Sequence, residues 1–322
     1  MRFNPKANIS RGRVGDAGRG GRGGGGGFGG GGGGGGMRLP IPGGTRAGGG
    51  IGGLIIIILF VVVSSCLGGG DGGLPEGGGT GIDAGSQGGN PAGLQQDSER
   101  YENCKTGADA NKDVDCARKA VLFSLEQFWA KTLPEQANTE LAPAETLTFS
   151  GGIGTGCGDA TSQVGPFYCP ADQGIYLDTT FFADVLEGQL GGKGGDFVEP
   201  YVLAHEYGHH IQNLLGTMGK VRTQQGPDSD AVRLELQADC YAGMWTRYAQ
   251  DSDLMTLDQA DIDEALDSAK TVGDDRIQQK SGQEINPDAW NHGSSEQRMN
   301  WFTVGLEQGT LEACDTFSAS QL

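Results

Sequence analysis

Apolar residues recur every three or four positions in several stretches after residue 100, a spacing typical of amphipathic helices. Pro134 is expected to end the first of these helices, and Gly191 and Gly216 stand where helices commonly terminate. Ser294, with Gln297 three residues on, has the spacing of a capping box. The pattern predicts helices at Cys116–Leu133, Phe181–Leu190, Val198–Leu215, from Asp228 or Ser229 to Ala249, Leu257–Thr271 and Ser294–Leu306.

Two regions before the central helix have the alternation of strands rather than the spacing of helices. Glu145–Ser150 alternates along its length, and Gly165–Thr180 reads as two short strands joined by a turn at Pro170–Gly174. The second region could form an internal hairpin or offer an edge strand to an extended peptide. Together the elements predict a mostly helical α+β domain with a small strand region before its central helix.

Composition divides the chain into parts. Most of the 61 glycines fall in the first hundred residues, and a glycine-rich segment cannot bury enough apolar surface to offset its ordering entropy. Residues 1–50 are therefore predicted to be a disordered tail. They carry eight Lys or Arg against one acid, so a net charge of −25 falls on the rest of a chain whose total is −18. Such an acidic remainder argues against nucleic acid as a partner.

An unbroken apolar run, LIIIILFVVV, follows the basic tail. Residues 51–67 reach the lower limit for a membrane span, and a basic flank before them fits the positive-inside rule. The expectation is a single-pass protein of the bacterial cell membrane, with a flexible linker at 68–99 and an extracytoplasmic domain at 100–322. The alternative is a lipoprotein signal in VSSC, with the protein anchored through Cys66. In either case the membrane is an expected partner.

The cysteines after Cys66 form an even set, which in an exported domain suggests disulfides. Their proximity in sequence favours two short-range pairs and leaves a third that ties the C-terminus to a central helix. Buried free thiols are the alternative. The expected pairs are Cys104–Cys116, Cys157–Cys169 and Cys240–Cys314.

The segment LAHEYGHHIQNLL is the main candidate for a metal site, because it holds three of the four histidines. On a helix, His205 and His209 lie about 40° apart and can share one zinc ion. Glu206 lies about 100° from His205, beside such a metal, where it can act as a base toward water. His210 is rotated about 140° away and is expected to pack or hydrogen-bond instead.

A catalytic zinc site needs a third protein ligand. The metzincin pattern is excluded, because it would require Gly and His where the chain has Gln212 and Leu215. A later helix supplies RLELQADCYAGMW, in which Glu235 can bind the metal. Asp239, one turn on, can accept the free N–H of a ligating histidine. A solvated helix face is the competing interpretation, but the surrounding apolar residues indicate burial, and a buried carboxylate pair needs a cation.

HEYGH followed by ELQAD resembles the gluzincin metallopeptidases, which carry HExxH and ExxxD on two helices. With CGDATSQVGPFYCPADQGIYLD and HGSSEQR, the chain from about residue 101 to its end resembles the bacterial "putative neutral zinc metallopeptidase" family. The resemblance implies a gluzincin-like (zincin-like) fold with Zn²⁺ as cofactor. It implies His205, His209 and Glu235 as metal ligands and Glu206 as catalytic base.

His292 and Arg298 in HGSSEQR resemble the HPxxxxR element of membrane-associated gluzincins, with Gly293 in place of the proline. A histidine near the metal could donate to the oxyanion of the reaction, and Arg298 could pair with Asp239. A histidine that merely precedes a helix is the alternative.

The sequence as a whole therefore predicts a membrane-tethered zinc metalloendopeptidase acting on peptide or protein substrates. The alternative is a membrane-anchored, zinc-containing scaffold or binding protein without proteolytic activity.

Overall fold

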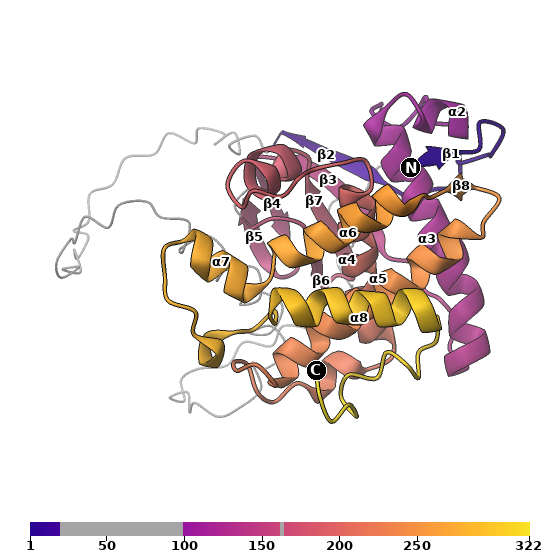
Figure 1. The fold of residues 1–322 in the computed structure, drawn as a ribbon. Helices are drawn as coiled ribbons and strands as arrows, with labels where there is room; N and C mark the ends of the chain where they lie inside the picture. The colour runs from indigo at the N-terminus through magenta and orange to yellow at the C-terminus, as the bar shows by residue number, and fades with distance from the viewer. Residues whose placement is uncertain (20–98, 162–163) are drawn as a thin grey trace, which may run out of the picture.

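The computed structural model describes residues 1–19, 99–161 and 164–322. Within them the protein is an α+β molecule with small sheets (Figure 1). Two short 3-10 turns and one π-helical turn are found at Thr217–Lys220, Pro287–Ala289 and Phe182–Glu187. The helices are α2 Gly107–Ala110, α3 Val114–Ala137, α4 Val198–Leu214, α5 Asp230–Gln250, α6 Gln259–Thr271, α7 Asp274–Lys280 and α8 Ser295–Gln308. The strands are β1 Arg2–Phe3, β2 Gly15–Arg19, β3 Glu145–Ser150, β4 Gly152–Thr155, β5 Gly158–Thr161, β6 Phe167–Cys169, β7 Gly174–Asp178 and β8 Met255–Thr256.

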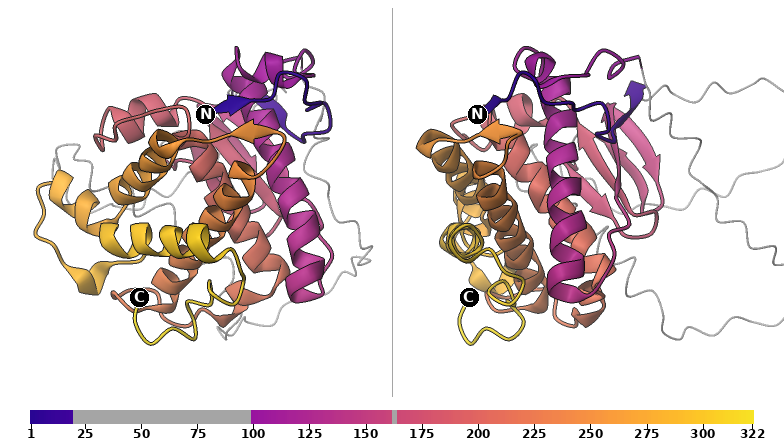
Figure 2. Two further views of the ribbon diagram at one scale, coloured as in Figure 1. Left: turned by 45° about the vertical axis from the view of Figure 1, so that its right-hand side comes forward. Right: turned by 90° about the vertical axis from the view of Figure 1, so that its right-hand side faces the viewer.

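The largest sheet has four strands in the order β2-β3-β7-β6. Strands β2, β3 and β7 run parallel, whereas β6 pairs antiparallel with β7 at the edge. Two further pairs, β4–β5 and β1–β8, are antiparallel. The sheet lies on one side of the molecule and α6 and α8 lie on the other, with α3 between them (Figure 2).

The strands expected at Glu145–Ser150 and within Gly165–Thr180 are present as β3 and the β6–β7 pair. The remaining strands have no counterpart among the expectations, and the helix expected at Phe181–Leu190 is a shorter π-helical turn. Pro134 does not end α3, which continues to Ala137 before Asn138 in a left-handed conformation. A proline so near the C-terminus removes one backbone hydrogen bond and leaves the rest of the helix intact.

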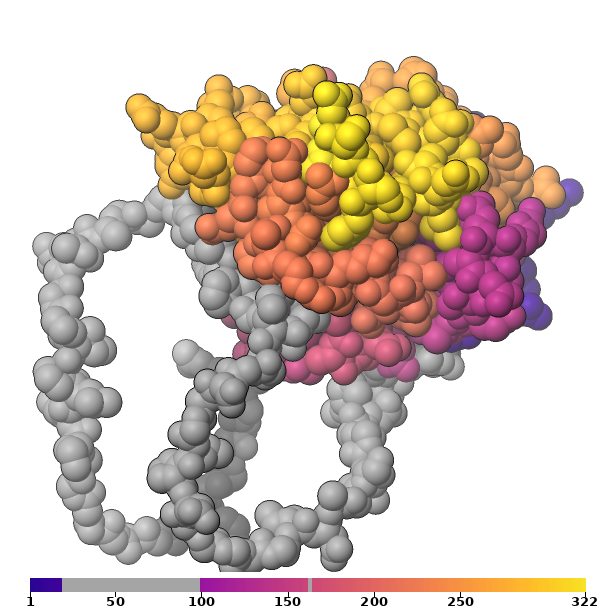
Figure 3. Space-filling view, turned by 90° about the horizontal axis from the view of Figure 1, so that it is seen from below, coloured from indigo at the N-terminus to yellow at the C-terminus, as the bar shows by residue number. Residues whose placement is uncertain are grey.

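The described residues form the three expected disulfides: Cys104–Cys116 and Cys157–Cys169, which sequence proximity favoured, and the remaining pair Cys240–Cys314. The last attaches the C-terminal segment to α5. Arg233 donates to the carbonyl oxygens of Thr316 and Ala319 on the same segment. The C-terminal residues consequently lie along the outer surface of the molecule (Figure 3).

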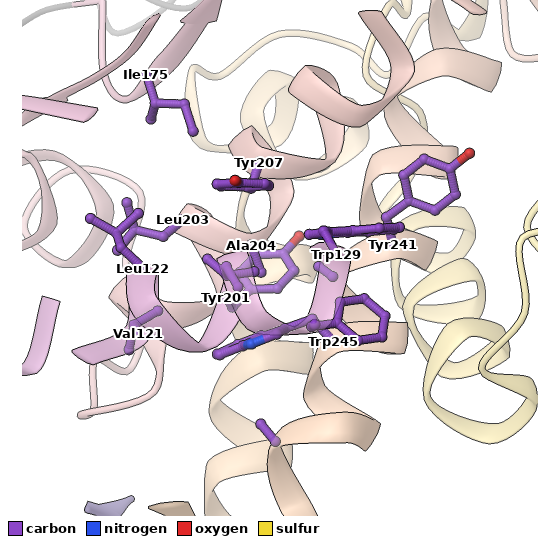
Figure 4. Close-up of a cluster of buried hydrophobic side chains, with 14 of the residues drawn as sticks. Val121, Leu122, Trp129, Ile175, Tyr201, Leu203, Ala204, Tyr207, Tyr241 and Trp245 are labelled. Carbon is purple, nitrogen blue, oxygen red and sulfur yellow. The ribbon is translucent and has the colours of Figure 1, made fainter. Parts of the chain in front are cut away.

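The core surrounds α4 with aromatic side chains (Figure 4). Trp129 of α3, Tyr207 of α4 and Trp245 of α5 are fully buried, and Trp245 stacks on Phe197 with 5.8 Å between ring centroids. Fully buried aromatic side chains of this size are the largest individual contributors to core stability. Because they fix α4 against α3 and α5, the other face of α4 is held in a defined position relative to α5.

Two glycines allow α5 and α8 to touch backbone to backbone. A Cβ at Gly305 would lie 1.9 Å from the carbonyl oxygen of Cys240, and one at Gly243 would lie 2.1 Å from that of Phe302. Any larger residue would push the helices apart. The start of α8 is fixed as well, because Ser294 and Gln297 form the expected capping box. Helix α8 therefore packs closely against α5, and Arg298 in its first turns lies beside His205 of α4.

The N-terminal residues differ from the expectation of a disordered tail over 1–50. Residues 1–19 belong to the folded body: Arg2 and Phe3 pair with β8, and Asp16 pairs with Thr148 of β3. The prediction of disorder from composition was wrong for these residues, because their strands are stabilised by pairing with strands far away in the sequence. Residues 20–50 and the linker at 68–98 lie outside the described residues.

The predicted single-pass membrane protein is contradicted. In the described ranges, no helix is long and apolar enough to cross a bilayer. The run at 51–67 and Cys66 themselves lie outside those ranges. The described residues on either side of that run, 1–19 and 99–161 with 164–322, pack into one body, as the β2–β3 pairing shows. These two parts therefore cannot lie on opposite sides of a membrane.

Candidate metal centre

Helix α4 presents two histidines side by side. His205 and His209, one turn apart, have ring centroids 4.7 Å from each other, and both side chains are buried. Between them in sequence and on the side that faces α5, Gly208 allows that helix to approach, since a Cβ there would lie 3.2 Å from the Cα of Ala238. The close crossing of the two helices brings the polar face of α4 against α5.

Glu235 of α5 completes this cluster. One carboxylate oxygen lies 3.3 Å from Nε2 of His205 and the other lies 3.4 Å from Nε2 of His209. One ligand atom from each of the three residues falls within 4.8 Å of the others. The structure therefore brings together the three residues that the sequence singled out on two separate helices.

The other nitrogen of each imidazole is held by a neighbour. Nδ1 of His205 lies 2.8 Å from Oδ1 of Asp239, and Nδ1 of His209 lies 2.8 Å from Oε1 of Gln212. Both partners are acceptors, so each Nδ1 carries a proton and each Nε2 faces Glu235, where a bound cation would take the place of a second proton. Gln212 is itself oriented, because its amide nitrogen donates to the carbonyl of Leu234 at 2.7 Å.

This donor set fits a zinc ion. Two Nε2 atoms and a carboxylate converge in a buried site, an arrangement that needs a cation, either a proton or a metal ion, between them. In a tetrahedral site with metal–ligand distances of about 2.0–2.1 Å, neighbouring ligand atoms lie about 3.3 Å apart. The 3.3 and 3.4 Å separations match that spacing. With three protein ligands, such a site has a fourth position open to water or substrate.

The electrostatics of the pocket favour positive charge beside α4. Burial lowers the pKa of His205, but Asp239 and Glu235 outweigh it and raise this pKa to about 10. Burial raises the pKa of Glu235, yet the two histidines hold it well below its usual value. The acids of α5 thus remain ionised in an interior where a carboxylate without a partner would be protonated.

Glu206 follows His205 directly and is also buried, with 7% of its surface exposed. Burial raises the pKa of its carboxyl group, although His209 and His205 act in the opposite direction. A carboxylate with a raised pKa beside a metal site is suited to take up a proton and release it again.

Asp239 gathers four hydrogen bonds in the interior. Besides His205, it accepts from the hydroxyl of Tyr201 at 2.6 Å. Arg298 of α8 donates to both of its oxygens, from Nε at 2.7 Å and from Nη2 at 3.0 Å. Burial raises the pKa of Asp239, but Arg298 and His205 lower it to about 2. These two hydrogen bonds attach α8 to Asp239, the residue that holds Nδ1 of His205.

His292 precedes α8 and is buried against the same region. Its Nδ1 lies 3.0 Å from Oδ1 of Asp274, the first residue of α7. Gly293, which stands where the HPxxxxR element has proline, has a φ of 90° that proline cannot adopt. The departure from that element therefore has a conformational reason.

His210 does not join the cluster. Its Nε2 lies 2.6 Å from the carbonyl oxygen of Ala142 and its Nδ1 lies 3.1 Å from the hydroxyl of Tyr168 in β6. Asn213 donates to the same hydroxyl at 2.8 Å. His210 thus attaches the edge strand to α4, in line with the packing role expected from its helical angle.

Three residues of the site were not anticipated from the sequence: Tyr201, Gln212 and Asp274. Tyr201 and Gln212 lie one turn before His205 and three residues after His209, so helical spacing alone could have suggested them. Asp274 carried no such signal, because it lies on a short helix that the apolar pattern did not predict.

Comparison with known proteins agrees with the chemistry of the cluster. The chain is 50% identical over 228 residues to uncharacterized proteins of Mycobacterium tuberculosis and Mycobacterium bovis, covering 68% of this chain and 76% of theirs. It is 41% identical over 206 residues to the uncharacterized protein YpfJ of Escherichia coli K12, covering 62% and 70%. No solved structure matches it. The profile of the family described as "Putative neutral zinc metallopeptidase" matches residues 6–317, and the chain belongs to that family.

Proposed function

We propose that the protein is a zinc-dependent endopeptidase of the gluzincin type. One observation carries the proposal: the Nε2 atoms of His205 and His209 converge on both oxygens of Glu235, with Glu206 buried beside them. Family membership supports it. His205, His209 and Glu235 would hold the metal, which would polarise the scissile carbonyl and make an attacking water more acidic.

The protein's own groups divide the remaining work. Glu206 takes a proton from the attacking water and delivers it to the amine that leaves when the peptide bond breaks. Asp239 and Gln212 fix the tautomers of the two histidines, which keeps both lone pairs directed at one point. His292, when its ring is protonated, serves as a donor to the oxyanion through Nε2, because its Nδ1 is held by Asp274 and Nε2 makes no hydrogen bond within the described residues.

Strand β6 connects the sheet to the histidine helix. It forms one edge of the described sheet, and Tyr168 at its centre is joined to α4 through His210 and Asn213. The Cys157–Cys169 disulfide fixes its far end. The residues of β6 are at most 2% exposed, so this edge is covered and offers no backbone for strand addition. We propose that the substrate is a peptide or protein segment that reaches the histidine helix without pairing to β6.

The test uses purified full-length protein loaded with zinc. Wild type is expected to bind one zinc and to cleave casein or a peptide library. Glu206→Gln is expected to keep the zinc and lose cleavage, whereas Glu235→Ala should lose the zinc itself. Cleavage by the Glu206→Gln variant would refute the mechanism, and unchanged zinc content in the Glu235→Ala variant would show that the third ligand is wrong. A wild-type protein that binds zinc and cleaves nothing would favour a scaffold instead.

A further inference from the structure

We propose that Asp274 is a positioning residue that holds the Nδ1–H tautomer of His292, so that the ring, once protonated, presents Nε2–H to the substrate oxyanion. The inference rests on the proposed function for its catalytic consequence only. The tautomer itself is a property of the folded chain and can be measured whether or not the protein cleaves peptides.

The carboxylate of Asp274 is enclosed by the loop that carries His292. Its Oδ2 accepts the backbone N–H groups of Asn291, His292 and Gly293 at 2.8, 2.7 and 3.1 Å. Its Oδ1 faces Nδ1 of His292 at 3.0 Å. In return the backbone N–H of Asp274 donates to the carbonyl of Gly293 at 2.9 Å. The loop and the imidazole are thus fixed by a single side chain.

This loop packs against α5 next to the metal ligand. A Cβ at Gly293 would lie 3.2 Å from side-chain atoms of both Val232 and Leu236, the residues that flank Glu235 on its own helix. A proline at 293 would also lack the N–H that donates to Asp274. The glycine therefore permits both the close packing and the complete set of bonds around the carboxylate.

The charges around His292 come from three helices. Burial lowers its pKa, but Asp274 of α7 outweighs burial and raises it, and Glu235 of α5 acts in the same direction. Arg298 of α8 opposes them. Burial raises the pKa of Asp274. His292 and the backbone N–H groups outweigh burial and lower this pKa below its ordinary value, so the carboxylate stays ionised. An ionised acceptor at Nδ1 leaves the histidine as a donor at Nε2 whenever the ring is protonated.

The experiment compares Asp274→Asn with Asp275→Asn. In the first variant the amide oxygen can still accept the three backbone N–H groups, while the amide nitrogen faces Nδ1 and forces the proton onto Nε2. Asp275 is a matched control: it lies next in α7 and accepts from the backbone N–H and hydroxyl of Ser295 at 2.7 and 2.8 Å. Melting temperatures of both variants verify that each is folded.

The first readout is ¹⁵N NMR of histidine-labelled protein, in which only four imidazoles contribute and His292→Gln identifies one. Wild type and Asp275→Asn should show Nδ1 of His292 protonated throughout. Asp274→Asn should move the proton to Nε2 and lower the pKa of His292 by about 1–2 units. An unprotonated Nδ1 in wild type, or an equal shift in Asp275→Asn, would overturn the proposal.

The second readout is kinetic. Asp274→Asn should lower kcat by about 10–100-fold with little change in KM, because the neutral Nε2–H ring that it favours is a weaker donor to an oxyanion than the imidazolium. It should have no further effect in a His292→Ala background. Additive losses in the double variant would contradict a role exerted through His292. Because NMR does not depend on turnover, an inactive wild-type protein with the expected tautomer would refute the peptidase proposal and leave the positioning inference standing.

Discussion

Replacing Asp239 with asparagine separates its role in holding zinc from its role in holding the fold. The substitution keeps the shape but removes the charge to which Nδ1 of His205 donates at 2.8 Å. Loss of such a partner weakens metal binding by about 10–100-fold, or roughly 1.4–2.7 kcal/mol. The same change leaves the buried guanidinium of Arg298 without its carboxylate, which costs about 3–5 kcal/mol of unfolding free energy.

A second arginine–carboxylate pair, with a buried arginine and a partly buried acid, provides the control. Glu199 of α4 accepts two hydrogen bonds from Arg118, which also contacts Asp115, and it lies about two turns before the first metal ligand. Glu199→Gln should lower the unfolding free energy by about 1.5–3 kcal/mol. It should leave zinc affinity unchanged, because no described contact of Glu199 reaches the histidines.

The assay is competition for zinc against a chelator of known affinity, paired with denaturant unfolding of the same samples. We expect weakened zinc binding for Asp239→Asn alone and reduced stability for both variants. Zinc affinity within twofold of wild type in Asp239→Asn would refute the positioning of His205 by Asp239. Equal weakening in Glu199→Gln would show that affinity merely follows stability.

Three further outcomes are expected. Gln212→Leu should weaken zinc binding by about tenfold without abolishing it, because His209 loses the acceptor for its Nδ1 proton; chelator competition measures this, and unchanged affinity would count against the tautomer assignment. Burial raises the pKa of Glu126 to about 7, so its charge destabilises the fold increasingly as pH rises from about 4.5 through 7. Glu126→Gln should therefore gain about 1–3 kcal/mol of unfolding free energy at pH 8 and little at pH 5, and a gain independent of pH would refute the assignment. Replacing both Cys240 and Cys314 with alanine opens a loop of 74 residues and should cost about 4 kcal/mol in chemical denaturation; a loss below 1 kcal/mol would contradict that expectation.

The candidate metal ligands could be predicted from local spacing, because residues four apart on a helix lie on the same face. His205 and His209 needed only the period of α4, and the ELQAD segment needed only the period of α5. The cap at Gly216 and the capping box at Ser294 are likewise decided by neighbours within four residues. These features depend little on how the chain packs.

Features that depend on packing were missed. The N-terminal strands are stabilised by partners such as Thr148, more than a hundred residues away, and their own composition gives no sign of it. Asp274 acquires its role only because α7 places it under the loop of His292. The single-pass membrane span was predicted from composition and charge order, and it is contradicted, because no helix in the described ranges is long and apolar enough to cross a bilayer.

The most direct test of the account is the rate of peptide-bond hydrolysis per bound zinc, measured on a quenched peptide mixture with wild type and Glu206→Gln carrying equal zinc. The account predicts that wild type cleaves and that the variant is slower by at least about 100-fold, since it lacks the proton acceptor. Equal rates in the two proteins, or no hydrolysis by zinc-loaded wild type, would contradict it.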